Sequence, residues 1–194
     1  MVDAFSDVGA DHVADLVGET PLCWIVPRAE PQSAMLMPVL LERDAAGAAR
    51  SLLGHLPRRA PATTALELSG AAEFLFLGPN AYIAPVDAGR SDWGPTWNFA
   101  SARISGDVTF DTALTGPALV ALVRHLEGVD GWSVAALGDR YDALAERVIG
   151  FRAAIGDVAP RFKLAQDEEP AVRGNILAAF EGTPLGRWMR RFAP

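Results

Sequence analysis

The sequence contains little cysteine and almost no lysine. Cys23 is the only cysteine among 194 residues, which excludes an intramolecular disulfide and any zinc site built from several cysteines. Lys163 is the only lysine, so nearly all basic charge is carried by arginine. The formal net charge is −7, and neutralising nucleic-acid phosphates needs clustered cations. Direct DNA binding is therefore a doubtful function for this chain.

Long apolar runs and flexible linkers are also missing. No run approaches the roughly 18 residues that a membrane-spanning helix needs. The N-terminal stretch MVDAFSDVGADHV carries acidic residues where a signal peptide carries basic ones, so we expect a cytoplasmic protein. Half of the residues are hydrophobic, and no Ser/Gly-rich stretch divides the chain. We therefore expect a single domain over 1–194 with a helical C-terminal extension over about 168–194.

Short apolar runs bounded by turn-forming residues dominate the first half. Apolar spacing predicts a short helix over 11–17. The runs PLCWIV, SAMLMPVLLE and RSLLGHL, between residues 21 and 56, predict three strands. Pro38 should occupy an edge or a bulge, because proline cannot donate to a ladder. A short helix is expected within 58–68, and the runs EFLFLG and AYIAPV should form a hairpin around GPN.

The second half begins with a strand and then becomes mostly helical. Residue alternation predicts a strand from Thr96 through WNFASARISG. Apolar residues recur at helical spacing in GPALVALVRHLEG and in LGDRYDALAERVIGF, which predicts two helices. A strand is expected over FRAAIGDVAPRFKL, followed by helices over 170–181 and 185–191. Closely spaced antiparallel strands with peripheral helices predict an α+β protein built on a small β-barrel.

Four segments occur in the order seen in a known family: GHLPRRAP, FLGPNAYIAP, PTWNFA and VIGFRAAIGDVAPRFKLAQDEEPAVRGNI. The chain resembles the PaiB family of FMN-binding negative transcriptional regulators over roughly residues 22–181. The resemblance implies a split β-barrel, six-stranded, antiparallel and of Greek-key type, with peripheral helices. It also implies a homodimer that holds FMN at its interface and serves a regulatory or sensing role. This sequence departs from the family at its start, at VDAGRSDWG and at residues 27–29.

Basic residues after the third predicted strand are candidates for binding the FMN phosphate. Arg58 and Arg59 suit this role because a guanidinium forms paired, charge-assisted hydrogen bonds. The alternative is a solvated loop pair. His55 is a candidate contact to the flavin edge or phosphate, although a histidine beside leucines is often structural.

Aromatic and polar residues at two further segments are candidates for the flavin ring. Tyr82 lies at the predicted hairpin. Alternation places Thr96 and Asn98 on one strand face and Trp97 on the other, so the polar pair is expected to bind a ligand on the barrel surface while Trp97 packs beneath. The alternative is that Trp97 makes core or dimer contacts and Asn98 satisfies a bulge.

The segment FKLAQ and the C-terminal RWMRRF supply the last candidates. Lys163 and Gln166 are expected to approach the flavin from the partner subunit, the alternative for Lys163 being a plain surface charge. RWMRRF could form a nucleic-acid patch, which the acidic composition disfavours. GxSxG, HExxH and P-loop motifs are absent, so no catalytic or metal-ligating residue is assigned.

Three functions remain open. The leading hypothesis is an FMN-binding, regulatory or sensing homodimer. A flavin-dependent oxidoreductase of the flavin reductase or pyridoxamine oxidase class would use the same pocket. A divergent, flavin-free interaction module would suit the altered family motifs.

Overall fold

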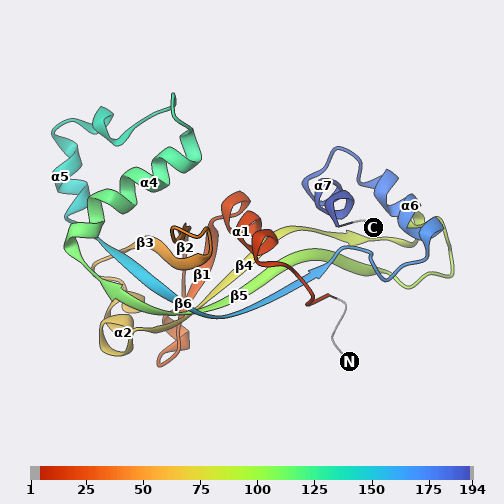
Figure 1. Cartoon of the computed structure of the whole chain (residues 1–194), viewed down its shortest axis with the longest axis horizontal. Helices are drawn as coiled ribbons and strands as arrows, with labels where there is room; N and C mark the ends of the chain where they lie inside the picture. The colour runs from red at the N-terminus through yellow and green to blue at the C-terminus, as the bar shows by residue number, and fades with distance from the viewer. Residues whose placement is uncertain (1–4, 193–194) are drawn as a thin grey trace. The chain divides into compact units, whose positions relative to one another are not determined.

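The computed structural model describes residues 5–192, which divide into two compact units (Figure 1). Within the described residues, unit 1 combines residues 5–16, Leu77–Ala102 and residues 159–192. Unit 2 combines Val17–Phe76 and Arg103–Val158. The boundary between them falls within the first helix and within three long strands, so each unit is built from segments that are distant in sequence.

Six antiparallel strands form a closed barrel in the order β1-β2-β3-β6-β5-β4. Their bounds are β1 Leu22–Pro27, β2 Met35–Arg43, β3 Ala49–Pro57, β4 Ala71–Ile83, β5 Thr96–Phe110 and β6 Val148–Lys163. The last strand in sequence lies between β3 and β5, and β4 closes the barrel onto β1. This arrangement confirms the six-stranded split-barrel prediction.

Pro38 lies where β2 changes its pairing partner. It is the last β2 residue that pairs with β1, and pairing with β3 begins at Val39. The register shift between β2 and β3 lies farther along, between Glu42 and Arg43. The missing N–H of the proline is therefore placed at a change of partner rather than at the bulge.

The described part of the chain also contains seven α-helices and three short 3₁₀ helices. The α-helices are α1 Ala10–Glu19, α2 Pro61–Ser69, α3 Pro85–Ala88, α4 Thr115–Glu127, α5 Arg140–Ala145, α6 Pro170–Ala179 and α7 Pro184–Arg191. The 3₁₀ helices are η1 Pro31–Ser33, η2 Thr112–Leu114 and η3 Val134–Leu137. Proline at the first position begins α2, α6 and α7, where its missing N–H has no partner to lose. The predicted N-terminal and C-terminal helices are confirmed.

Two local predictions were wrong. The hairpin around GPN does not form, because β4 continues through Gly78, Pro79 and Asn80 without a positive φ at Gly78 or Asn80. A Cβ at Gly78 would collide with Leu16, which explains why the strand carries glycine there. The helix predicted over LGDRYDALAERVIGF ends at Ala145, and the residues from Val148 onward enter β6 and pair with β3.

Each unit has its own aromatic core. In unit 2, Phe151 stacks with Phe74 at 6.3 Å and meets Phe110 edge-on at 6.1 Å. In unit 1, Phe162, Trp188 and Phe192 pack together, with centroid separations of 5.2 to 5.8 Å. These clusters explain why the aromatic residues of β6 and of the basic C-terminal helix are spaced as they are.

The lone cysteine is inert. Cys23 is buried in β1, and burial raises the pKa of its thiol to about 12. It behaves as a small buried hydrophobic side chain. Among residues 5–192, no group of acidic, histidine or cysteine side chains could hold a metal ion, and no helix is long and apolar enough to cross a membrane.

Candidate functional site

A cleft of about 700 Å³ opens in unit 2 where β3 ends. Pro57, Arg58 and Arg59 line it from the end of β3 and the loop before α2. Glu146 and Arg147 line it from the segment that joins α5 to β6, together with Ala143. The structure therefore brings the predicted pair of arginines together with Arg147, which sequence analysis missed. We call this feature the arginine cleft.

Two hydrogen bonds fix the two walls of the arginine cleft. The backbone N–H of Arg58 donates to the carbonyl of Arg147 at 2.9 Å, which extends the β3–β6 ladder by one step. The Arg58 Nε donates to the carbonyl of Glu146 at 3.0 Å. Arg58 is thus held by its Nε, while its two Nη groups remain for other acceptors.

The charge of the arginine cleft is strongly positive. Within residues 5–192, none of Arg58, Arg59 and Arg147 forms an ion pair with a carboxylate. Glu146 is the one acidic residue in the lining, so cations exceed anions by two. The nine-residue helix α2 begins at Pro61, and its positive end lies next in the chain to these arginines. The cleft is therefore suited to a ligand with a multiply charged anionic group.

His55 lies on β3 but does not line the arginine cleft. It is half-buried and pairs across the ladder with Gly150 of β6. Its Nδ1 atom is buried and has no hydrogen-bond partner in the described chain. Burial lowers the pKa of this histidine, so the neutral ring is favoured.

The other predicted residues lie in unit 1, where Thr96, Lys163 and Gln166 already have hydrogen-bond partners. Lys163 Nζ donates to Thr96 Oγ1 at 2.6 Å, which joins the start of β5 to the end of β6. Gln166 Nε2 donates to the carbonyl of Phe162, and its Oε1 accepts from the N–H of Leu164. Gln166 therefore stabilises its own turn. That Gln166 and Lys163 approach the flavin of a partner subunit stays a prediction.

The side chains of β5 alternate between two faces as expected, but the face predicted to be exposed is buried and the face predicted to be buried is exposed. Asn98 is 2% exposed, and its Nδ2 lies 4.0 Å from the Met189 sulfur in α7. Trp97 lies on the opposite face, is 53% exposed, and meets the ring of Tyr82 edge-on at 6.2 Å. Trp97 and Tyr82 thus form an exposed aromatic pair, whereas the amide of Asn98 points into unit 1.

Comparison with known proteins identifies the family. A family model described as "Putative FMN-binding domain" matches residues 2–157, which is most of the chain. The chain belongs to this family. The match includes the arginine cleft, Tyr82 and the Thr96–Asn98 segment, whereas Lys163 and Gln166 lie beyond it. No curated protein matches the sequence.

Solved structures with the same fold are only distantly similar in sequence. The FAD and heme binding protein from Mycobacterium smegmatis has a TM-score of 0.59 and 16% identity, covering 82% of this chain and 73% of that one. The flavocytochrome Anf3 from Azotobacter vinelandii has a TM-score of 0.57 and 16% identity, covering 81% and 69% respectively. At such identities the likeness shows the fold alone.

A second surface feature of this family member lies on the outer face of β1, β2 and β4 in unit 2. Trp24 pairs with Leu36 on one side and with Leu75 on the other. These side chains are 49%, 44% and 40% exposed, and we call them the apolar stripe. Sequence analysis missed it, although Leu22, Trp24 and Val26 place apolar residues on the outward face of a strand whose inward face is apolar as well.

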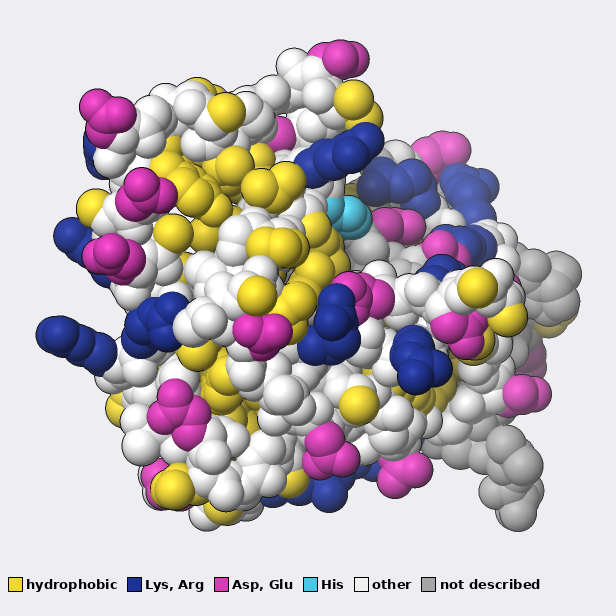
Figure 2. Space-filling model, turned by 60° about the vertical axis from the view of Figure 1, so that its left-hand side comes forward, with side chains coloured by type: hydrophobic (Ala, Val, Ile, Leu, Met, Phe, Trp, Pro, Cys, Tyr) yellow, Lys and Arg dark blue, Asp and Glu magenta, His cyan; other side chains and the backbone are white. Residues whose placement is uncertain are grey.

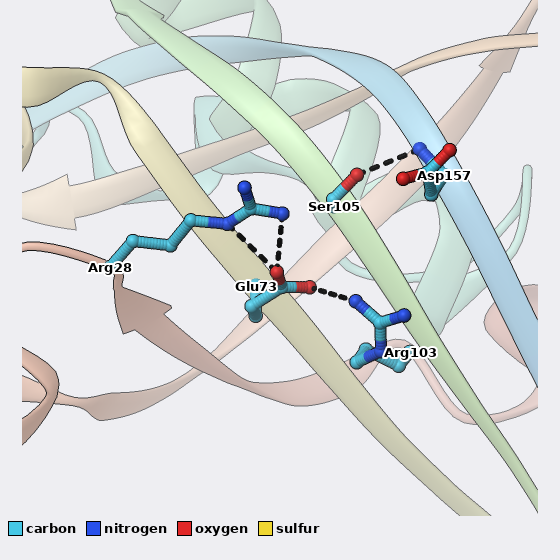
Figure 3. Close-up of polar contacts among 5 residues, drawn as sticks. All are labelled: Arg28, Glu73, Arg103, Ser105 and Asp157. Atoms are coloured by element: carbon cyan, nitrogen blue, oxygen red, sulfur yellow. Dashed lines mark hydrogen bonds and ion pairs between the residues drawn. The ribbon is translucent and has the colours of Figure 1, made fainter.

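A charged cluster is centred on Glu73, two residues before Leu75 of the apolar stripe on β4. Figure 3 shows this cluster. Arg28 Nε donates to Glu73 Oε1 at 2.8 Å, and Arg103 Nη1 donates to Glu73 Oε2 at 3.1 Å. Nearby, Ser105 Oγ accepts from the backbone N–H of Asp157 at 2.7 Å. Exposed apolar residues beside arginine pairs are typical of a protein interface.

Proposed function

We propose that this protein binds FMN and that the arginine cleft of unit 2 holds its phosphate. The observation that carries the proposal is the convergence of Arg58, Arg59 and Arg147, none paired with a carboxylate in the described chain, on one cleft. A phosphate dianion matches the excess of two positive charges. Family membership independently supports a flavin ligand.

Individual cleft residues would have different tasks in holding the phosphate. Arg58 is oriented by its bond to the Glu146 carbonyl, so it can present both Nη groups to phosphate oxygens with little loss of side-chain entropy. Arg59 and Arg147 would neutralise the remaining charge from opposite walls. FMN supplies one- and two-electron redox chemistry when bound. The chain itself would bind the cofactor, orient it and restrict access to it.

Unit 1 has an exposed aromatic pair of its own, Tyr82 and Trp97, which is a separate candidate for contact with an isoalloxazine ring and is not assigned to the ligand of the arginine cleft. Planar aromatic side chains bind such rings by stacking or by edge-to-face contact. This role is tested separately from that of the arginine cleft. If this pair contacts a flavin ring, Trp97→Ala should weaken FMN and riboflavin equally, because the two ligands share the ring.

We also propose a homodimer formed through the apolar stripe. Trp24, Leu36 and Leu75 expose large side chains side by side, and the arginines around Glu73 would form a polar rim. Light scattering during size-exclusion chromatography should report a dimer. Trp24→Asp should convert it to a monomer, whereas Leu68→Asp, at a 79% exposed position in α2, should not. A monomeric wild-type protein would refute this interface.

A regulatory or sensing role of the PaiB type follows as the narrower proposal. It is supported by the four family segments and by the absence of a catalytic motif in the sequence. The alternative is a flavin-dependent oxidoreductase. Rapid reduction of the bound flavin by NADH or NADPH would favour the oxidoreductase, and an inert bound flavin would favour the regulator.

The deciding experiment compares FMN with riboflavin, which lacks the phosphate. Bound FMN should give absorption bands at about 370 and 450 nm. Each of Arg58→Gln, Arg59→Gln and Arg147→Gln should weaken FMN about tenfold, or roughly 1.4 kcal/mol, and leave riboflavin unchanged. Arg140→Gln is the matched control, because this α5 arginine does not line the cleft.

Two results would overturn the proposal. Failure of the wild-type protein to bind FMN would refute a flavin function altogether. Binding of FMN with equal affinity by all three arginine variants would place the phosphate elsewhere and refute the assignment of the arginine cleft.

A further inference from the structure

A second hollow of about 330 Å³ lies in unit 2 and shares no lining residue with the arginine cleft. It is formed by the outer side of α4 and the loop that follows the helix. The residues that define its walls are Val120, Val123 and Arg124 from α4, and Val129, Trp132 and Val134 from the loop and η3. We call it the valine pocket.

Local sequence explains why the valine pocket exists. Positions 120, 123 and 124 are spaced three and four residues apart, so they share one face of α4. Gly128 ends the helix with a φ of 80°, a conformation that favours glycine. Gly131 then passes so close to the Glu127 carbonyl that a Cβ would collide with it. The loop is thereby folded back along the helix, and Trp132 forms one wall of the hollow.

The lining is mostly apolar and open to solvent. Val120 is 47% exposed, Val129 78% and Trp132 46%. Figure 2 shows hydrophobic side chains gathered on the side of the molecule that carries α4 and α5. A concave apolar hollow of this volume with one aromatic wall is typical of a small-molecule site, and covering it would remove apolar surface from water.

Arg124 is the only charged residue in the lining. In the part of the chain that the structure describes, it forms no ion pair with a carboxylate. A guanidinium beside an apolar surface complements a carboxylate or sulfonate attached to a ring. A single cation matches a single negative charge, which distinguishes this hollow from the arginine cleft.

We propose that the valine pocket binds a small aromatic molecule with one anionic group. The ring would contact Val120, Val123 and Trp132, and the anionic group would pair with Arg124. This second site does not depend on flavin binding. In a sensing protein, it would provide a place where an organic acid acts independently of the cofactor.

A pair of fluorescent probes tests the proposal in the full-length protein. 8-Anilinonaphthalene-1-sulfonate carries one sulfonate, and N-phenyl-1-naphthylamine has the same ring skeleton without it. Arg124→Gln should weaken the sulfonate about fivefold and leave the uncharged probe within about twofold. Trp132→Ala should weaken both probes about fivefold or more. Leu126→Ala is the control, since this 60% exposed residue of α4 lies outside the lining.

Several outcomes would overturn the proposal. Equal weakening of both probes by Arg124→Gln would refute an anion contact, and unchanged binding by Trp132→Ala would show that the probes bind elsewhere. Absence of probe binding to the wild-type protein would refute the pocket. If Trp132→Ala does not fold, Val129→Asp replaces it, because this residue is 78% exposed. That variant should weaken the sulfonate more than the uncharged probe, and equal binding by both would refute the site.

Discussion

Replacing Gly54 with alanine should destabilise the barrel by crowding its interior. Gly54 pairs with Phe151 across β3 and β6. A Cβ at this position would lie 2.7 Å from Phe151 Cζ and 3.1 Å from Val39 Cγ1. Phe151 has little room to retreat, because it is fully buried and packs against Phe74 and Phe110. Packing therefore requires glycine at position 54, because a Cβ there meets Phe151 and Val39.

The magnitude follows from two opposing effects. Overpacking costs about 1–3 kcal/mol, and the loss of glycine's backbone freedom in the unfolded state offsets about 0.5–1 kcal/mol. We expect Gly54→Ala to lower the free energy of unfolding by about 1–2 kcal/mol and the Tm by about 2–8 °C. Urea denaturation followed by far-UV circular dichroism measures the change.

Two further variants make the result decisive. Gly174→Ala is the control, because a Cβ at this α6 position meets nothing within 4 Å, so it should be neutral or stabilising by up to about 1 kcal/mol. Combining Gly54→Ala with Phe151→Leu should cost less than the sum of the single changes, by about 1 kcal/mol. A Gly54→Ala protein as stable as the wild type, or strictly additive costs, would refute the packing argument.

Three other predictions concern titratable groups. Arg152 lowers the pKa of Glu42 by hydrogen bonding, so the stability that this pair contributes is present above about pH 4.3 and is lost as the pH falls further. Acid unfolding of Glu42→Gln should therefore lack this pH-dependent loss of stability. Burial lowers the pKa of His55, so stability should fall as the pH drops below about 6.5, and His55→Gln should flatten that slope in urea titrations. Cys23 should react with a disulfide reagent only on unfolding, because its pKa of about 12 leaves almost no thiolate at pH 8, and rapid reaction of the folded protein would contradict its burial.

Most strands were predictable from short apolar runs, and β5 from alternation, but local turn signals were misleading where tertiary packing decided the conformation. Glycine, proline and asparagine at 78–80 favour a turn in isolation. In the fold, Gly78 is needed because Leu16 packs against the strand there, and β4 runs on. The contact of α1 with this position is not visible from the neighbouring residues.

The candidate site was predictable only where its residues lie in one short segment. Arg58 and Arg59 follow a predicted strand directly, so the segment itself indicated them. Arg147 reaches the arginine cleft because β6 pairs with β3, and that long-range register cannot be read from spacing. Alternation likewise showed that Trp97 and Asn98 face opposite ways, but not which side α7 covers.

The pairing of β3 with β6 also affects synthesis of the protein. β3 leaves the ribosome early, while the β6 residues that pair with it are still to be made. At a translation rate of roughly 5–20 residues per second, the edge of β3 that will pair with β6 stays unpaired for on the order of 5–20 seconds. During that interval the sheet formed by β1, β2 and β3 has an unpaired apolar edge that other chains can contact. The yield of folded protein should therefore depend on the rate of translation and on chaperones that cover nascent strands.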